Sequence, residues 1–448
     1  MPEAGRLQEK HMLGTIIVRE ILEYIKTTKF LLGLFLTVTL VVIVTSVNIM
    51  EYTARKQVYL DSTRKPSSEV VYRGPQPLSI FAQGVDLASG EKKTLFIYYM
   101  LREDMENKGA DPFLLADFGF GTVDFLFIIK VIISLLVIFF AYDIVSGEKE
   151  RGTLKLSLSN SLPRWILMLG KMLSGLGVVT MFLAVSLLVA ALIVAFQPDV
   201  HFSVGDWIRV LLIFGVSLMY LSVFFTLSAM VSIIANSAAV TLLILVQLWV
   251  MIAIVIPGGG ALMAQTAHPT DIPNLQETDK QVQAVEDEYR KKIDTLGAVD
   301  TNEKAYTQGS LSNESNEALV ARVYMPLSNA LTREAEKIQN AMMISPAGLY
   351  ERIVLRLART DFEEYDYFQK GVFVYWKMSS TDRLNRIFKK NLPLPGKMQA
   401  AKEPVFSYRS EGIGESLFRM GWNLFILFAW SLVFFVTAHA AFLRKDVQ

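Results

Sequence analysis

The residues best suited to chemistry in this chain form a short charged run, Glu148 to Arg151, that lies between Gly147 and Gly152. Both glycines favour a break in helical structure, because glycine lowers the stability of a helix interior. Residues 153–158 then restore an alternation of apolar and polar side chains. A rigid, charged turn of this kind is suited to binding a soluble protein and to passing force to the segments beside it. The run therefore indicates a docking element and not a catalytic centre.

A new helix is expected soon after this run. Asn160 or Ser161 can cap its first turn, and Pro163 is tolerated there because its missing N–H would have no partner in any case. The predicted order is a helix, a sharp turn, a short exposed element and a second helix. Three glycines in that second helix permit close approach of a neighbouring helix: Gly170, Gly175 and Gly177.

Several kinds of catalysis are disfavoured by composition. The chain has no cysteine, which excludes disulfides, Cys-ligated zinc, iron–sulfur clusters and thiol catalysis. No G-x-x-x-x-G-K-[ST] phosphate loop occurs, so the chain has no ATP site of that type. The net charge of +1 gives no indication of a nucleic-acid partner. The histidines are too scattered to form a local metal motif: His11, His201, His268 and His439.

The composition is that of a membrane protein. Apolar side chains make up 52% of the 448 residues, charged residues only 19%, and the mean hydropathy is +0.36. The apolar residues form blocks long enough to cross a hydrocarbon core of about 30 Å as helices. We expect an all-α polytopic membrane protein with six transmembrane helices at residues 30–50, 125–142, 167–196, 207–234, 238–256 and 417–443.

Lys and Arg are concentrated in the segments expected on one side of the membrane. The leader 1–29, the loop 143–166 and the tail 444–448 carry them, whereas the loop 197–206 has none. Because short basic flanks face the cytoplasm, both termini are expected there. The leader also has apolar residues at helical spacing, which indicates an amphipathic helix in the interface plane or an extension of the first span.

Two long segments are then expected outside the membrane. Residues 51–124 include strand-like pieces at 69–72 and 94–99, which indicates a smaller mixed α/β insertion. Residues 257–416 repeat apolar positions at three- and four-residue steps, which indicates a large, mostly helical domain. In it we expect two long helices joined by a polar loop around Gly309 to Asn316, then a helix that begins after Ser345 and Pro346.

An aromatic run follows that helix, from Phe362 to Trp376. One interpretation places its rings in the core of the outer domain or on the membrane surface. The other uses Phe368, Tyr375 and Trp376 to line a site for an amphipathic substrate or a partner.

Two polar residues within the predicted spans also have two interpretations each. Lys130 either extends its ammonium to the interface or contacts a substrate or the second subunit of a dimer. Gln247 either forms a hydrogen bond to a neighbouring helix or makes such a contact.

The charged run and the segment after it resemble the signature of permease subunits of type-2 ATP-binding-cassette (ABC-2) exporters. In that family the acidic residues and Gly-Thr-Leu belong to a coupling loop that docks on the ATPase, and Pro-Arg and Gly-Lys open the third span. The resemblance implies that ATPase coupling is carried by Glu148, Glu150, Arg151, Gly152, Thr153, Leu154, Pro163 and Arg164. The six-span topology and the leader helix also agree with the family.

A second resemblance lies in the outer domain. The segment from Ser345 to Phe362 is similar to a bacterial branch with large extracytoplasmic insertions, which includes relatives of the permease that serves nitrous oxide reductase maturation. Members of that branch usually have Gly where this chain has Arg359. The bacterial cytoplasmic (inner) membrane is the location that this resemblance implies.

The resemblance implies a permease without enzymatic activity of its own. ATP and magnesium would bind to two copies of a partner ABC ATPase, and the permease would form a homodimer or pair with a close relative. The complex would export an amphipathic, lipid-like or peptide substrate. One alternative is a complex in which ATP-driven motion of the outer domain acts on a periplasmic or surface partner without transport; another is a membrane sensor or carrier outside the ABC class.

Overall fold

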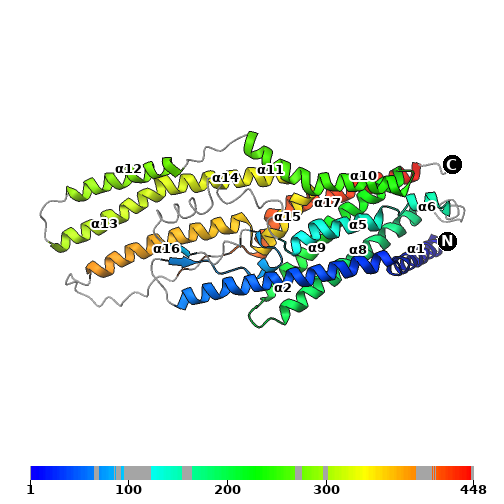
Figure 1. Ribbon diagram of the computed structural model, residues 1–448, viewed down its shortest axis with the longest axis horizontal. Helices are drawn as coiled ribbons and strands as arrows, with labels where there is room; N and C mark the ends of the chain where they lie inside the picture. The colour runs from blue at the N-terminus through cyan, green and yellow to red at the C-terminus, as the bar shows by residue number, and fades with distance from the viewer. Residues whose placement is uncertain are drawn as a thin grey trace.

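The computed structural model is an elongated, almost entirely helical protein (Figure 1). A bundle of long apolar helices forms one part, and a group of polar helices extends from one end of it. The residues that the structure describes are 2–64, 70–84, 86, 92–94, 123–153, 164–267, 275–295, 301–389, 406, 408 and 410–444.

Within these described residues, six helices are long and apolar enough to cross a membrane, which confirms the expected all-α polytopic membrane protein. We number them in chain order: span 1, α2 (Thr28–Arg64); span 2, α4 (Phe125–Phe127), η3 (Ile128–Ile133), α5 (Ser134–Ala141) and α6 (Ser146–Glu150); span 3, α8 (Arg164–Ala195); span 4, α9 (Val204–Ile234); span 5, α10 (Ala238–Val250), η4 (Met251–Val255) and α11 (Ile256–Ala267); span 6, α17 (Ile413–Arg444).

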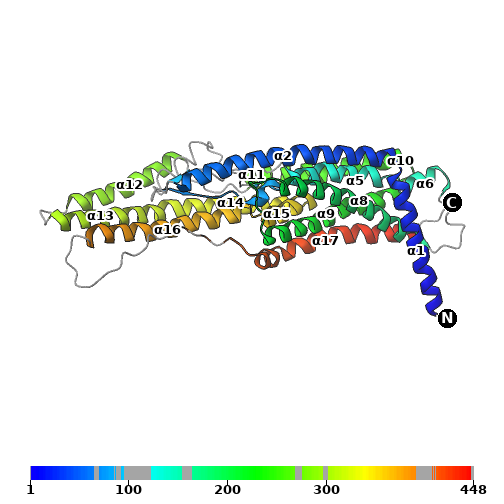
Figure 2. The ribbon, with the colours of Figure 1, turned by 90° about the horizontal axis from the view of Figure 1, so that it is seen from below.

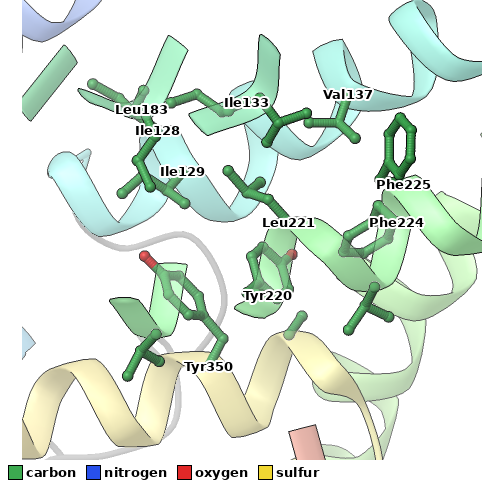
Figure 3. Close-up of a cluster of buried hydrophobic side chains, with 14 of the residues drawn as sticks. Ile128, Ile129, Ile133, Val137, Leu183, Tyr220, Leu221, Phe224, Phe225 and Tyr350 are labelled. Atoms are coloured by element: carbon green, nitrogen blue, oxygen red, sulfur yellow. The ribbon is translucent and has the colours of Figure 1, made fainter. Parts of the chain in front are cut away.

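Span 4 provides much of the buried core of the bundle. Its helix begins with a capping box, in which Ser203 and Asp206 each accept a hydrogen bond from the other's backbone N–H. Farther along, Tyr220 and Phe224 are fully buried in a hydrophobic cluster that also includes Ile129 of span 2 (Figure 3). Because lipid tails are as apolar as these side chains, close packing and not the hydrophobic effect holds spans 2 and 4 together here.

Both termini lie at the same end of the bundle, which we call the terminal end (Figure 1). Helix α1 (Pro2–Ile25) is separated from span 1 by Lys26 and Thr27, and it runs at a steep angle to span 1 (Figure 2). It packs against span 3. Helix α6 also lies at the terminal end, so the charged run is close to the ends of several spans (Figure 1).

The opposite end carries the distal domain, which consists of α12 (Leu275–Asp294), α13 (Thr301–Leu319), η5 (Val320–Tyr324), α14 (Met325–Met342) and α16 (Phe362–Lys389). These helices lie side by side and extend well beyond the span bundle (Figures 1 and 2). Their apolar faces meet in a core that includes Val282, Val285, Val320, Val323 and Phe368. The predicted helical domain is therefore present.

The predicted polar loop around Gly309 to Asn316 is wrong, because these residues lie inside α13. Helices α13, η5 and α14 follow one another without a break from Thr301 to Met342, about 60 Å at 1.5 Å per residue. Glycine costs only about 1 kcal/mol in a helix, and packing against α16 offsets that cost. The connection between α12 and α13 falls at residues 296–300, outside the described residues.

The first outer segment also differs from expectation, because the helix of span 1 continues past Met50 to Arg64. Tyr52 is buried, and Arg55 forms an ion pair of 3.2 Å with Asp86, so tertiary contacts hold this extension. Strand β1 (Val70–Tyr72) confirms one predicted strand and pairs antiparallel with β2 (Lys92–Thr94). Of the other predicted strand, 94–99, only Thr94 lies in the described residues.

The two outer segments pack against each other. Val71 of β1 belongs to the core of the distal domain. Gly84 has a φ of +48°, and a Cβ added there would lie 2.3 Å from the carbonyl oxygen of Thr360. Only glycine permits this close approach, which joins the loop after η1 (Pro77–Ile80) to the end of the helix that precedes α16.

Candidate functional site

The charged run lies in a compact element, residues 146–153, which we call the charged element. Span 2 turns at 142–145, and the Ser146 hydroxyl donates a hydrogen bond to the carbonyl oxygen of Tyr142. Gly147 lies within α6, so the prediction that it breaks the helix is wrong. Gly152 does interrupt the chain just after the end of α6, with a φ of +69° that L-residues with a Cβ rarely adopt.

Glu148 lies in an ion-pair network that joins three segments of the chain. The Nζ atom of Lys171, on span 3, lies 2.7 Å from Oε1 of Glu148 and 3.1 Å from Oε1 of Glu20 on α1. Lys171 is 5% exposed, and both carboxylates are largely covered. Because an ammonium in such a place is stable only with partners, this network fixes α1 and α6 against span 3.

The network has more negative than positive charge. Two carboxylates share one ammonium, and Oε2 of Glu148 is buried without a hydrogen-bond partner among the described residues. Burial raises the pKa of Tyr24, also on α1, and the negative charges of Glu20 and Asp143 add to this effect. Both carboxylates therefore depend on Lys171 as their cation.

Lys149 caps the end of span 4. Its ammonium donates hydrogen bonds to the carbonyl oxygens of Ser232, Ile233 and Ala235. These carbonyls have no partner within the helix, and the negative end of the helix dipole favours a cation there. The Ser232 hydroxyl in turn accepts hydrogen bonds from two backbone N–H groups at the start of α6.

Glu150 caps the start of span 5. Its Oε1 accepts a hydrogen bond of 2.9 Å from the backbone N–H of Ala238, the first residue of α10. The consecutive residues Glu148, Lys149 and Glu150 therefore contact spans 3, 4 and 5 in turn. Helix α6 is therefore in direct contact with the ends of all these spans.

The last residues of the charged element, from Glu150 onward, are exposed on its outer face. Glu150, Arg151, Gly152 and Thr153 are exposed, and Arg151 also donates a hydrogen bond from Nε to the carbonyl oxygen of Gly147. Leu154 and Pro163 lie outside the described residues, and Arg164 is the first residue of α8. The element thus has one face held by its own spans and another that is open to a partner.

The span 3 glycines lie where neighbouring helices approach closely. A Cβ added to Gly170 would be 2.7 Å from Ile16, and one added to Gly177 would be 3.3 Å from Ile21, both on α1. A Cβ added to Gly175 would be 2.2 Å from the ring of Phe225 on span 4. These glycines let span 3 contact α1 and span 4 at short distance.

Other predicted site residues lie away from the charged element. Lys130 does not extend to an interface: its Nζ lies 2.8 Å from Oε2 of Glu351, and its side chain is 7% exposed. Gln247 is exposed on span 5 and makes no side-chain hydrogen bond among the described residues, so the predicted bond to a neighbouring helix is not present. Phe368 and Trp376 are buried in the distal core, with Tyr375 packed against it, which favours the structural interpretation of the aromatic run.

Sequence reasoning missed Glu20 and the role of Lys149. Glu20 is 151 positions from Lys171, and no local pattern links them. The residue type of Lys149 could have suggested a capping role, since Lys and Arg often cap helix ends. The helix that it caps, however, ends far along the sequence, so its identity could not be predicted.

The six-span α-helical bundle, with a charged element that ties several spans together at one end, is that of a polytopic membrane protein. A family model described as ABC-2 family transporter protein matches residues 15–447, and the chain belongs to this family. It is the membrane component of an ABC transporter, a class in which a separate subunit hydrolyses ATP. No curated protein matches the chain.

Proposed function

We propose that this permease converts ATP hydrolysis on a bound ABC ATPase into movement of its spans, and that the complex exports an amphipathic, lipid-like or peptide substrate. The observation that carries this proposal is the set of contacts from Glu148, Lys149 and Glu150 to three different spans. An ATPase that displaces α6 acts on all three at once. We assign contact with the ATPase to the exposed residues Arg151 and Thr153.

The active complex contains two copies of this chain, or one copy and a close relative, with two ATPase subunits that bind ATP and magnesium. Support for the pairing comes from span 5, where Gln247 lies on an exposed face with Val240, Ile244, Met251 and Val255. An amide in the middle of a span is costly in lipid without a hydrogen-bond partner. A second copy supplies one, since glutamine both donates and accepts.

The terminal end faces the bacterial cytoplasm in this proposal, because the basic flanks of the spans lie there. The absence of cysteine allows a clean test by labelling intact cells with a membrane-impermeant maleimide. Lys280→Cys, on exposed α12, should be labelled in intact cells, and Thr153→Cys only after the membrane is opened. Labelling in the reverse pattern contradicts this orientation.

A second candidate function is force transmission without transport. The extent of the distal domain favours it, since the continuous helix from Thr301 to Met342 reaches far beyond the spans. In that case ATP hydrolysis moves the domain against a periplasmic or surface partner. ATPase activity stimulated by a substrate in reconstituted vesicles, or its efflux, favours export over this alternative.

Co-purification tests the proposal most simply. The chain is isolated from its host in mild detergent, its partners are identified by mass spectrometry, and ATP hydrolysis is measured. Arg151→Glu with Thr153→Asp should lose the ATPase because both changes lie on the exposed face. Lys171→Met should keep the ATPase bound but reduce substrate-dependent hydrolysis. If no ABC ATPase accompanies the wild type, the proposal fails.

A further inference from the structure

Helix α15 (Pro346–Ala358) lies between the distal domain and the spans, although it is not itself a span. Its residues Ala347, Leu349, Tyr350, Ile353 and Leu357 are fully buried, several of them in the same hydrophobic core as the spans. Helix α15 packs against spans 2, 4, 5 and 6. Residues 343–345 join it to α14 on one side, and residues 359–361 join it to α16 on the other.

Specific polar contacts fix α15 to three spans. Glu351 pairs with Lys130 of span 2 at 2.8 Å. The Tyr350 hydroxyl lies 2.9 Å from the Ser217 hydroxyl of span 4, and its ring stacks on Tyr220 with centroids 4.4 Å apart (Figure 3). Ser345, which caps α15, donates a hydrogen bond to the carbonyl oxygen of Ile252 of span 5.

Both span 2 and span 5 widen into π-helical turns where they meet α15, at η3 and η4. A π-helical turn interrupts the regular hydrogen bonding of an α-helix and is often found at functional sites. Here the carbonyl oxygen of Lys130 accepts hydrogen bonds from the hydroxyls of Tyr220 and Ser134. The carbonyl oxygen of Ile252 accepts one from Ser345 in the same way.

Span 2 therefore has a contact of functional interest at each end. At the terminal end it carries Glu148, in the network with Lys171, and toward the distal end it carries Lys130. The Lys130–Glu351 pair is buried, with side chains 7% and 14% exposed. A buried pair resists separation more strongly than an exposed one, because each charge would be left without a partner.

We propose that α15 transmits movement of span 2 to the distal domain, and that Lys130 and Glu351 are the positioning residues that make this contact. The inference rests on the proposed function, since the ATPase supplies the movement. When the charged element moves span 2, Lys130 carries Glu351 with it, and α14 and α16 follow because α15 connects them. Arg356 braces this connection through ion pairs to Glu363 of α16 and Glu411 before span 6.

The test measures an ATP-dependent distance in the complex with its ATPase. Because the chain has no cysteine, Lys280→Cys and Asp199→Cys provide two unique spin-labelling sites, one on α12 and one in the loop between spans 3 and 4. Double electron–electron resonance gives the distance between the two labels without nucleotide and after ATP and vanadate have trapped the complex. The wild type should show a change in distance on trapping.

Two double variants identify the role of the pair. Lys130→Met with Glu351→Met keeps the volume but removes both charges, and it should retain ATP hydrolysis while losing the distance change. Lys130→Glu with Glu351→Lys restores the pair and should restore the change. A pair with a merely structural role would alter the nucleotide-free distance or the thermal midpoint and leave the ATP-dependent change intact.

Each other outcome has a definite meaning. If the complex hydrolyses ATP and the wild-type distance stays constant, or if the methionine pair keeps the full change, the inference about α15 is overturned and the proposed function stands. If no ATPase binds the chain, the proposed function fails and the inference fails with it.

Discussion

The ammonium of Lys171 lies 2.7 Å from one carboxylate oxygen of Glu148 and 3.1 Å from one of Glu20. These residues come from span 3, α6 and α1, and their contact is the point at which the leader helix meets the charged element. Because the ammonium is buried, its loss leaves two carboxylates without their cation. The network therefore contributes to the stability of the fold.

Lys171→Met is expected to destabilise the protein by about 2–4 kcal/mol, near the range for removing one partner of a buried ion pair. The thermal midpoint in detergent measures this effect. Glu23→Gln is the matched control, since the Glu23–Arg19 pair on the same leader helix is exposed. Its loss should cost less than about 1 kcal/mol. Equal effects of the two substitutions would show that the network does not stabilise the fold.

Gly175→Ala should destabilise the protein by about 1–2 kcal/mol, because its Cβ would lie 2.2 Å from the ring of Phe225. Gly215→Ala, in span 4, is the control: a Cβ there has open space and should stabilise the helix by up to about 1 kcal/mol. In a double-mutant cycle, Phe225→Leu should relieve part of the cost of Gly175→Ala. Additive effects in that cycle would contradict the close contact.

Arg359 has a left-handed backbone, with φ 59° and ψ 34°, at the end of α15. Arg359→Gly and Arg359→Ala both remove the guanidinium, but only alanine keeps the Cβ that strains this conformation. The glycine variant should be more stable than the alanine variant by about 1 kcal/mol, as measured by thermal unfolding. Greater stability of the alanine variant would rule out the left-handed turn.

The stability of the part of the protein around Asp361 and Asp86 should fall as pH rises from about 4 to about 7. Burial raises the pKa of Asp361 to about 7, with a further contribution from Glu363, whereas Arg356 opposes the effect. Burial likewise raises the pKa of Asp86 to about 6. The folded state then holds protons that the unfolded state has released, so raising the pH favours unfolding. For Asp361 this amounts to at most about 4 kcal/mol.

Asp361→Asn tests this expectation. Oδ1 of Asp361 accepts a hydrogen bond from the backbone N–H of Glu364, and an asparagine oxygen can accept the same bond. The variant should match the wild type near or below pH 4 and be more stable at pH 8. Asp294→Asn, on exposed α12, should follow the wild-type profile. An unchanged pH profile for Asp361→Asn would contradict the assignment.

Features that depend on neighbouring residues in sequence could be predicted. The six apolar segments are recognisable by length alone, and Ser345 and Pro346 do begin α15, with the Ser345 hydroxyl accepting a hydrogen bond from the backbone N–H of Ala347. The polar loop predicted at Gly309 to Asn316 is wrong because that prediction also depended on neighbouring residues alone. Local composition there resembles a turn, but packing against α16 keeps the residues helical.

Features that depend on distant residues could not be predicted. The interpretation of Lys130 as reaching the interface was reasonable for a lone lysine in a span, and its partner Glu351 lies 221 positions away. The charged element was recognised from its own residues. Its contacts to spans 3, 4 and 5 became apparent only once the ends of those spans were placed beside it.

The proposed function requires that the exposed face of the charged element binds an ABC ATPase. Thr153→Cys provides the chain's single thiol on that face, and Asp199→Cys provides one in the loop between spans 3 and 4. In native membranes, a short thiol-reactive cross-linker should join Thr153→Cys to an ABC ATPase, as identified by mass spectrometry, and should not join Asp199→Cys to it. Cross-linking of the ATPase through position 199, or no ATPase adduct at position 153 while the ATPase co-purifies, would contradict this account.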